Sequence, residues 1–270
     1  MTARVIEAGG RDVAVFEAGD GAPLVYLHGF ADLHGVGADP FPFHQALARA
    51  RRLVAPAHPG CAESAEYQDL STVEDAVYHT LEVLDALEIH RFDLVGHCMG
   101  GWIAAELAVR HPERVGSLTL IGACGLFVAG APIGDVFMMA QPERGVDHAG
   151  LRRMLFAAGD TKLGNQLFPD GRGEIDDEMR RYQMLRFASF IGFRPPYFYN
   201  RSLVNRLHRV TCPALVIWGA EDAMVPLAHG HAYAAGLAGS NGLEIVSGAG
   251  HAAHLEEPDR VAGLVTEFLP

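Results

Sequence analysis

The sequence predicts an α/β fold in which a mostly parallel central sheet, flanked by helices, is interrupted by one helical insertion. Short apolar runs alternate with segments of helical periodicity up to about residue 124, which is the pattern of a parallel sheet. The alternation stops over residues 125–210 and resumes afterwards. A chain of 270 residues, 49% of them hydrophobic, suits one domain of this kind. We therefore expect a sheet domain formed by residues 1–124 and 211–270, with a helical insertion at 125–210 after the sixth strand.

The first half of the chain supplies six predicted strands. Two of them, Arg4–Ala8 and Val13–Glu17, flank a Gly9-Gly10 turn and suit an antiparallel edge of the sheet. Thr72 is a good helix N-cap, and the apolar spacing after it predicts a helix that ends near Leu87. The remaining patterns predict strands at 24–27, 53–56, 92–95 and 118–121, and further helices at 43–51 and 102–109.

In the second half of the chain the alternation of predicted strands and helices first stops and then resumes. Residues 125–210 contain no strand pattern, so we expect several helices joined by loops rich in glycine and proline. After them the sequence predicts a strand at 214–218, a helix at 228–237, a strand at 243–246 and a closing helix at 258–268.

Composition narrows the range of partners. The formal net charge of -12 disfavours binding to nucleic acid or to an anionic membrane surface, so we expect a small-molecule partner. The N-terminal residues carry no apolar segment of signal-peptide length, and no run reaches the roughly 18 apolar residues of a membrane span. The four cysteines form no CxxC pair and the histidines form no HExxH motif. We expect a cytoplasmic protein, monomer or homo-oligomer, with free thiols and without metal or cofactor.

The segment from Gly96 to Gly101 carries the strongest chemical signal. It reads Gly-His-Cys-Met-Gly-Gly and lies between an apolar strand and a helical run that begins at Trp102. In this pattern one glycine stands two residues before the nucleophile and another stands two residues after it, at a corner between a strand and a helix. Such a corner is a sharp turn that exposes the side chain of the nucleophile for reaction. The pattern therefore predicts that Cys98 is a nucleophile.

Candidate partners for Cys98 follow other predicted strands. A reactive thiol needs a base to take its proton and an acid to orient that base. Glu221 and Asp222 come after the strand at 214–218, and His251 and His254 come after the strand at 243–246. Because the carboxyl ends of parallel strands lie at one edge of the sheet, these groups are expected near Cys98.

These motifs, in this order, resemble those of the α/β-hydrolase superfamily from about Pro23 to the C-terminus, and the helical insertion resembles the cap of that superfamily. The resemblance implies that Cys98 is the nucleophile, Asp222 the acid and His251 the base. It also implies an oxyanion hole formed by the backbone amides of Phe30 and Met99. The cysteine departs from the usual serine, and the second glycine that many relatives have after the His-Gly pair is absent.

The predicted activity is hydrolysis of an ester, thioester or lactone through a covalent acyl-enzyme. A helix N-terminus and a histidine partner both lower a thiol pKa, so we expect a Cys98 thiolate paired with a His251 imidazolium. Alternatives with the same scaffold are an acyltransferase, a carbon–carbon bond hydrolase and a ligand-binding homologue with slow turnover, and the cysteine could replace a native serine. The aromatic-rich cap suggests a medium-sized apolar or aromatic acyl group, with candidate contacts at Phe137, Met138, Phe187, Phe190 and Tyr197.

Overall fold

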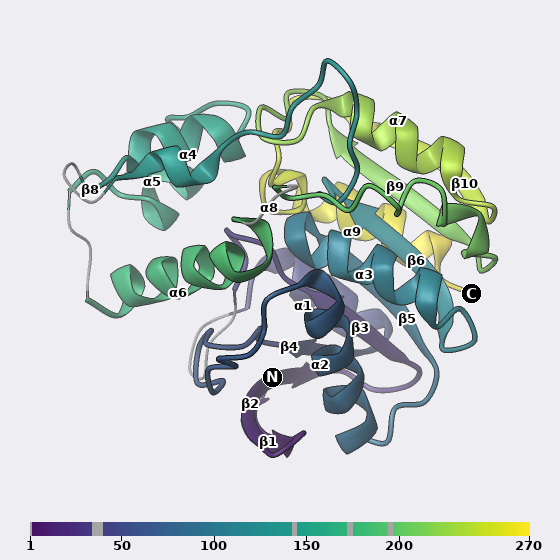
Figure 1. Ribbon diagram of the computed structural model, residues 1–270. Helices are drawn as coiled ribbons and strands as arrows, with labels where there is room; N and C mark the ends of the chain where they lie inside the picture. Colours follow the sequence, from purple (N-terminus) through teal and green to yellow (C-terminus); the bar gives the residue numbers. More distant parts are fainter. Residues whose placement is uncertain (1, 34–39, 142–144, 172–174, 194–196) are drawn as a thin grey trace.

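The computed structural model describes residues 2–33, 40–141, 145–171, 175–193 and 197–270, and its centre is an eight-stranded, mostly parallel sheet (Figure 1). The strand order is β1-β2-β4-β3-β5-β6-β9-β10, and β2 runs antiparallel to both of its neighbours, which confirms the antiparallel edge. The other pairings are parallel. The strands are β1 (Thr2–Ala8), β2 (Arg11–Ala18), β3 (Pro23–Leu27), β4 (Arg52–Pro56), β5 (Phe92–His97), β6 (Val115–Ile121), β9 (Ala214–Gly219) and β10 (Ser240–Val246).

Helices cover both faces of this sheet, so its central strands are buried on two sides. One apolar cluster contains side chains of α2 (Val73–Ala86), α3 (Cys98–Arg110) and α7 (Leu227–Gly236). A second cluster contains side chains of α1 (Pro42–Ala50) and α9 (Pro258–Phe268), which pack against each other. Every residue of β5 is buried, as expected for a central strand of a sheet that is covered on both faces.

Two helix starts follow directly from local sequence signals. The Thr72 side chain accepts a hydrogen bond from the Asp75 amide, and the Asp75 carboxylate accepts one from the Thr72 amide, which is a complete capping box. Pro258 occupies the first turn of α9, where its missing N–H removes no intrahelical hydrogen bond. Both helices therefore begin where the sequence predicts.

The insertion lies between β6 and β9 and contains three α-helices among the described residues. These are α4 (His148–Leu155), α5 (Lys162–Leu167) and α6 (Ile175–Gly192), and Figure 1 shows them to one side of the sheet. Two short 3-10 helices, η1 (Val136–Met139) and η2 (Leu207–Arg209), lie nearer its ends. The prediction that 125–210 lacks strands was wrong at one hairpin, β7 (Ala140–Gln141) with β8 (Gly145–Val146). Strands of two residues are too short to show an alternating pattern.

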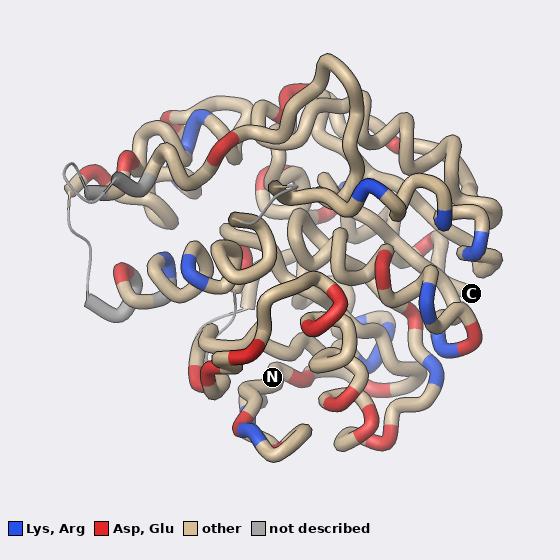
Figure 2. Tube along the Cα trace, viewed as in Figure 1, with Lys and Arg blue, Asp and Glu red and all other residues tan. Residues whose placement is uncertain are grey.

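Charge is unevenly distributed over the helices of the sheet domain. Helix α2 carries four acidic residues and no Lys or Arg, and Figure 2 shows these acidic positions on the same side of the molecule as the N-terminus.

Within the described part of the chain, no helix is both long enough and apolar enough to span a membrane.

Candidate active site

The corner between β5 and α3 presents Cys98 in a backbone conformation that L-residues rarely adopt. Cys98 is the first residue of α3 and has a φ of +55°. Close packing holds it there: a Cβ placed on Gly100 would lie 2.1 Å from the carbonyl oxygen of Leu27, at the end of β3. A Cβ on Gly29 would lie 2.7 Å from the Cβ of Cys98. Only glycine allows the β3 loop and the first turn of α3 to approach this closely.

Asp222 and His251 form a buried hydrogen-bonded pair after β9 and β10. The Oδ2 atom of Asp222 lies 2.9 Å from Nδ1 of His251, and both side chains are fully buried. The other oxygen, Oδ1, accepts hydrogen bonds from the amides of Met224 and Val225 at 2.9 and 2.7 Å. The carboxylate therefore favours the imidazole proton on Nδ1 and leaves Nε2 without a proton. That Nε2 is buried and has no hydrogen-bond partner among the described residues.

The rival acid and the rival base lie elsewhere. Glu221 is exposed, whereas Asp222 faces His251. His254 instead faces Asp32, with Nε2 of His254 at 3.2 Å from Oδ2 of Asp32. The geometry thus separates the two acids and the two histidines that the sequence left as candidates.

Asp32 is the centre of a buried polar network that the sequence analysis did not single out. Its Oδ1 accepts a hydrogen bond from the Gly29 amide at 2.8 Å and lies 3.3 Å from Nδ1 of His97. Its Oδ2 accepts from the hydroxyl of Tyr26 and faces His254. His97 extends the network, since its Nε2 donates to the carbonyl oxygen of His251 at 3.1 Å. The network therefore connects the loop after β3, the β5–α3 corner and the loop that carries His251.

The charge of Asp32 is maintained by its histidine neighbours. Burial favours the neutral carboxyl group, but the charge of His97 and the hydrogen bond from His254 outweigh it, and the pKa of Asp32 lies well below its usual value. Burial lowers the pKa of His254 to about 4. Asp32, His97 and His254 could each offer one ligand atom to a metal, with these atoms within 4.8 Å of one another. Because both Asp32 oxygens already accept hydrogen bonds from protein donors, we assign this cluster a structural role.

The two predicted oxyanion donors belong to different segments, Met99 to the first turn of α3 and Phe30 to the loop after β3. Met99 follows Cys98 in the first turn of α3 and is buried, and its amide acts to lower the pKa of the Cys98 thiol. Phe30 belongs to the loop that Asp32 holds through Gly29, and its buried ring meets the ring of Phe198 edge to face at 6.4 Å. The hydrogen bond from Gly29 to Asp32 and the ring contact with Phe198 thus hold the loop that carries Phe30.

The Cys98 sulfur lies in an apolar environment next to a second cysteine. Its Sγ is 3.9 Å from Sγ of Cys124, and both residues are fully buried. Burial raises the pKa of Cys98 well above its usual value, and the contact with Cys124 adds to this, while the Met99 amide acts in the opposite direction. The predicted resting thiolate was therefore wrong, because desolvation outweighs the position at the start of α3. The raised pKa favours the neutral thiol at rest.

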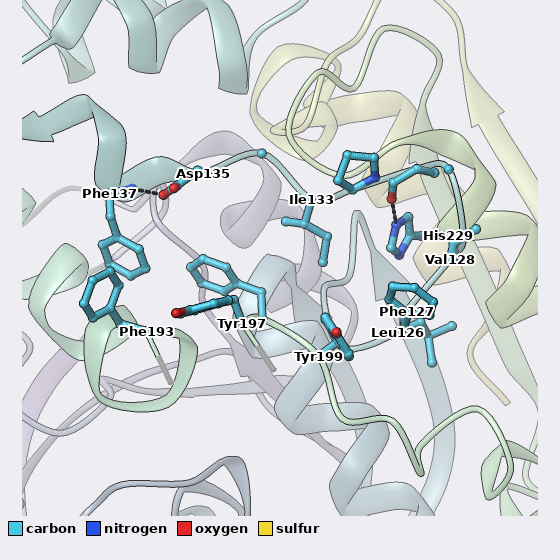
Figure 3. A pocket seen from close by; sticks show the side chains of 15 residues that line it. Leu126, Phe127, Val128, Ile133, Asp135, Phe137, Phe193, Tyr197, Tyr199 and His229 are labelled. Atoms are coloured by element: carbon cyan, nitrogen blue, oxygen red, sulfur yellow. Dashed lines mark hydrogen bonds between the residues drawn. The ribbon is translucent and has the colours of Figure 1, made fainter. Parts of the chain in front are cut away.

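An apolar pocket of about 510 Å³ lies between the segment after β6 and the end of the insertion. Figure 3 shows mostly aromatic and aliphatic side chains around it, and its polar groups include Asp135, His229 and the hydroxyls of Tyr197 and Tyr199. Of the predicted contacts, Phe137 and Tyr197 line this pocket. Phe137 stacks on Phe198 at 5.4 Å, and Phe198 in turn meets Phe30. A continuous row of aromatic rings therefore connects the pocket with the loop beside Cys98.

The other three predicted contacts lie outside this pocket. Phe187 is buried and stacks on the His58 ring at a centroid distance of 4.4 Å. Phe190 is half-buried beneath the guanidinium of Arg186, and Met138 is 58% exposed. Helical periodicity does not reveal which face of a cap helix meets the sheet domain, so the sequence could not separate these residues from Phe137 and Tyr197.

Hydrogen bonds join the insertion directly to the loop of His251. The Glu256 carboxylate accepts from the amide of Gly250 at 2.6 Å and from the amide of Ala157, just after α4, at 2.9 Å. The Ala252 amide donates to the carbonyl of Leu155 at 2.8 Å. The end of α4 and the loop of His251 are therefore held as one unit.

Comparison with known proteins identifies relatives along nearly the whole chain. A model of the alpha/beta hydrolase family matches residues 24–264. A 2-hydroxymuconate semialdehyde hydrolase from Pseudomonas sp. (strain CF600) is 31% identical, over 98% of this chain and 93% of its own length. A monoacylglycerol lipase from Xenopus laevis is 27% identical over 93% of this chain and 76% of its own. The crystal structure of a serine hydrolase involved in carbazole degradation has the same fold, with a TM-score of 0.75 and 23% identity over 99% of this chain and 98% of its own.

Proposed function

Since the chain belongs to the α/β-hydrolase family and is an enzyme of that family, we propose that it hydrolyses an ester, thioester or lactone through Cys98, His251 and Asp222. The observation that carries this proposal is the buried 2.9 Å hydrogen bond between Asp222 and His251, combined with the left-handed backbone of Cys98. This pair fixes the imidazole tautomer that a general base requires. The strand-to-helix corner is where the family presents its nucleophile.

Because the Cys98 thiol is neutral at rest, it must lose its proton as it attacks the substrate. As the Cys98 sulfur attacks the carbonyl carbon, Nε2 of His251 takes the thiol proton, and Asp222 stabilises the resulting imidazolium. The amides of Met99 and Phe30 stabilise the negative charge that develops on the carbonyl oxygen. His251 then gives its proton to the leaving group, which leaves a thioester on Cys98. A water molecule that His251 deprotonates hydrolyses this thioester and regenerates the thiol.

The apolar pocket supports a medium-sized apolar or aromatic acyl group as the substrate. Its wall consists mainly of aromatic and aliphatic side chains, and it is large enough for a group of that size. Burial of such a group against aromatic rings stabilises binding by about 25 cal/mol for each Å² of apolar surface removed from water. Esters and thioesters of acids with short or strongly polar chains are expected to be poorer substrates.

Hydrolysis of a carbon–carbon bond is the second candidate activity. It is supported by the 31% identical relative, which is named as a 2-hydroxymuconate semialdehyde hydrolase and matches over almost its whole length. The same triad serves this reaction if the leaving group is a carbon acid rather than an alcohol. The two candidates differ in the substrate that is consumed and not in the residues that act.

A substrate panel with three forms of the protein tests both candidates. p-Nitrophenyl esters of increasing chain length, acyl thioesters and 2-hydroxymuconate semialdehyde are offered to the wild type, Cys98→Ala and Cys98→Ser. We expect turnover by the wild type and a loss of at least about 1,000-fold in Cys98→Ala. Full activity in Cys98→Ala would rule out the proposed nucleophile. Much faster turnover by Cys98→Ser would identify the cysteine as a replacement for serine.

A parallel measurement separates hydrolysis from acyl transfer and from simple binding. Products are quantified with and without an added alcohol or amine, and exclusive hydrolysis rules out a transferase. Intact-mass analysis after exposure to an activated ester reports whether Cys98 is acylated. Ligand binding without an adduct and without product would contradict the proposal and favour a binding protein.

A further inference from the structure

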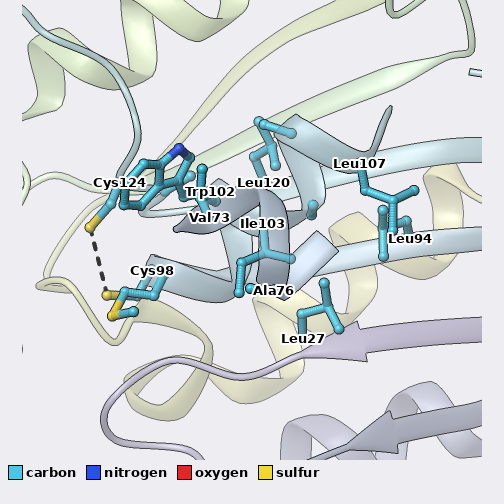
Figure 4. Close-up of a cluster of buried hydrophobic side chains, with 14 of the residues drawn as sticks. Leu27, Val73, Ala76, Leu94, Cys98, Trp102, Ile103, Leu107, Leu120 and Cys124 are labelled. Carbon is cyan, nitrogen blue, oxygen red and sulfur yellow. Dashed lines mark hydrogen bonds between the residues drawn. The ribbon is translucent and has the colours of Figure 1, made fainter. Parts of the chain in front are cut away.

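Cys124 contacts the sulfur of Cys98 and has no part in the triad proposed above. The two Sγ atoms are 3.9 Å apart in a fully buried position. Figure 4 shows them facing each other from the loop after β6 and the start of α3. A disulfide has a sulfur–sulfur distance of about 2.05 Å, so a movement of roughly 2 Å would join the two atoms.

The main chains that carry the two sulfurs are also in contact. The Cys124 amide donates a hydrogen bond to the carbonyl oxygen of Cys98 at 3.1 Å. The Cys124 carbonyl accepts one from the Tyr233 hydroxyl at 2.5 Å, and the next amide, that of Gly125, donates to the carbonyl of Phe198 at 2.9 Å. The first of these bonds joins the two cysteine backbones directly, and the other two hold the segment of Cys124 to α7 and to the segment of Phe198. The sulfur–sulfur gap is therefore to be closed by rotation of the two side chains on backbones that are already in contact.

The other two cysteines have different surroundings. The Cys61 sulfur points to the carbonyl oxygen of Gln183 at 3.7 Å, and Cys212 is half-buried after η2. In the part of the chain that the structure describes, Cys98 and Cys124 are the only cysteines whose sulfurs contact each other. A partner for an oxidised Cys98 is therefore already in place.

We propose that Cys98 and Cys124 form a reversible disulfide when the protein meets a hydroperoxide, and that this bond inactivates the enzyme. The effect on catalysis rests on the proposed function. In the first step the Cys98 sulfur attacks the hydroperoxide: an S–O bond forms, the O–O bond breaks, and an alcohol or water leaves with the thiol proton. In the second step the Cys124 thiol attacks the Cys98 sulfur: the S–S bond forms, the S–O bond breaks, and water leaves.

The burial of Cys98 favours a small oxidant, and its contact with Cys124 favours a disulfide as the product. Full burial and an apolar environment admit a small uncharged molecule such as hydrogen peroxide better than a charged one. His251, whose Nε2 is free of other hydrogen bonds among the described residues, can take the thiol proton during the first step. Because Cys124 is in contact, the sulfenic acid is converted to a disulfide before a second peroxide oxidises it irreversibly.

Mass spectrometry tests the proposal without any need for a substrate. The full-length protein is treated with hydrogen peroxide, the remaining thiols are alkylated, and the protein is digested with trypsin. Cys98 and Cys124 fall in separate tryptic peptides, 92–110 and 115–144. We expect the intact protein to lose two hydrogen atoms, these two peptides to become linked, and dithiothreitol to reverse both changes. An ester substrate from the panel should show nearly complete loss of activity and its recovery with dithiothreitol.

Matched variants give the controls. Cys124→Ala is expected to hydrolyse esters like the wild type but to lose activity irreversibly in peroxide, with oxygen atoms added to Cys98. Cys212→Ala is expected to behave like the wild type in every assay. Irreversible inactivation of the wild type without a linked peptide would overturn the proposal. Linked peptides in a protein whose Cys98→Ala form is fully active would instead overturn the proposed function and leave the disulfide standing.

Discussion

At the residue scale, Asp222 uses its two carboxylate oxygens for different purposes. Oδ1 holds the turn through the amides of Met224 and Val225, and Oδ2 orients His251. In Asp222→Asn the amide oxygen can retain the turn, while the charge that stabilises the imidazolium is lost. We expect kcat to fall by about 100-fold to 10,000-fold with little change in KM or in the free energy of unfolding.

The neighbouring carboxylate is the control for that substitution. Glu221→Gln removes the same charge one residue earlier, on an exposed side chain that does not face His251. Its kcat is expected to stay within about twofold of the wild type. Equal losses in the two variants would show that net charge near the site, and not the bond to His251, governs the rate. Steady-state kinetics and urea unfolding of all three proteins give the comparison.

The position of Cys98 could be predicted from sequence, but its state could not. Glycines at Gly96 and Gly100 and a strand before them specify a sharp corner, and the structure has that corner. The pKa of the thiol depends on burial and on Cys124, which is 26 residues away in the chain. Spacing carries no information on which two side chains converge after folding. The contact with Cys124 therefore required the structure.

At the element scale, the same substitution in two helices is expected to have opposite effects. Gly100 lies in the first turn of α3, where an added Cβ would be 2.1 Å from the Leu27 carbonyl oxygen. Gly263 lies within α9, and an added Cβ there meets nothing within 4 Å. Gly100→Ala should lower the free energy of unfolding by about 1–3 kcal/mol because backbone must move. Gly263→Ala should raise it by about 0.5–1 kcal/mol.

Urea unfolding and ester hydrolysis distinguish packing from chemistry in this pair. Gly263→Ala is expected to keep wild-type activity, since α9 lies far from the corner in sequence and packs against α1. Gly100→Ala is expected to lose activity under conditions in which it is still folded, because the Met99 amide and the Cys98 sulfur shift together. A stable and active Gly100→Ala protein would contradict the close packing between β3 and α3.

The strands that precede Asp222 and His251 could be predicted from sequence, for a physical reason. Strands buried on both faces give unmistakable apolar runs, and side chains just past their carboxyl ends must converge at one edge of the sheet. Asp222 and His251 follow β9 and β10 in this way. The role of Asp32 could not be predicted from sequence, because its hydrogen-bond partners come from four segments. No local sequence pattern distinguishes it from an ordinary aspartate in a loop.

At the scale of the whole molecule, buried histidines couple folding to pH. Burial is the main cause, and the charge of Arg11 a second cause, that together lower the pKa of His79, on α2, from an ordinary value of 6.5 to about 4. The unfolded chain therefore binds a proton at His79 as the pH falls below about 6.5, while the folded protein does not until about pH 4. The free energy of unfolding decreases across this window, by up to about 1.4 kcal/mol per pH unit for one such group.

Replacement of His79 tests this coupling away from the catalytic groups. Neither ring nitrogen of His79 has a hydrogen-bond partner among the described residues, so His79→Phe removes the proton site without breaking such a bond. Urea unfolding at intervals from pH 7 to pH 4 should show a shallower loss of stability in His79→Phe than in the wild type. His208→Phe, at an exposed position, should keep the wild-type slope. Part of the dependence of the free energy of unfolding on pH should persist in His79→Phe, because His254 is buried with a similarly low pKa. Identical slopes of this dependence in all three proteins would show that His79 does not remain neutral in the folded state.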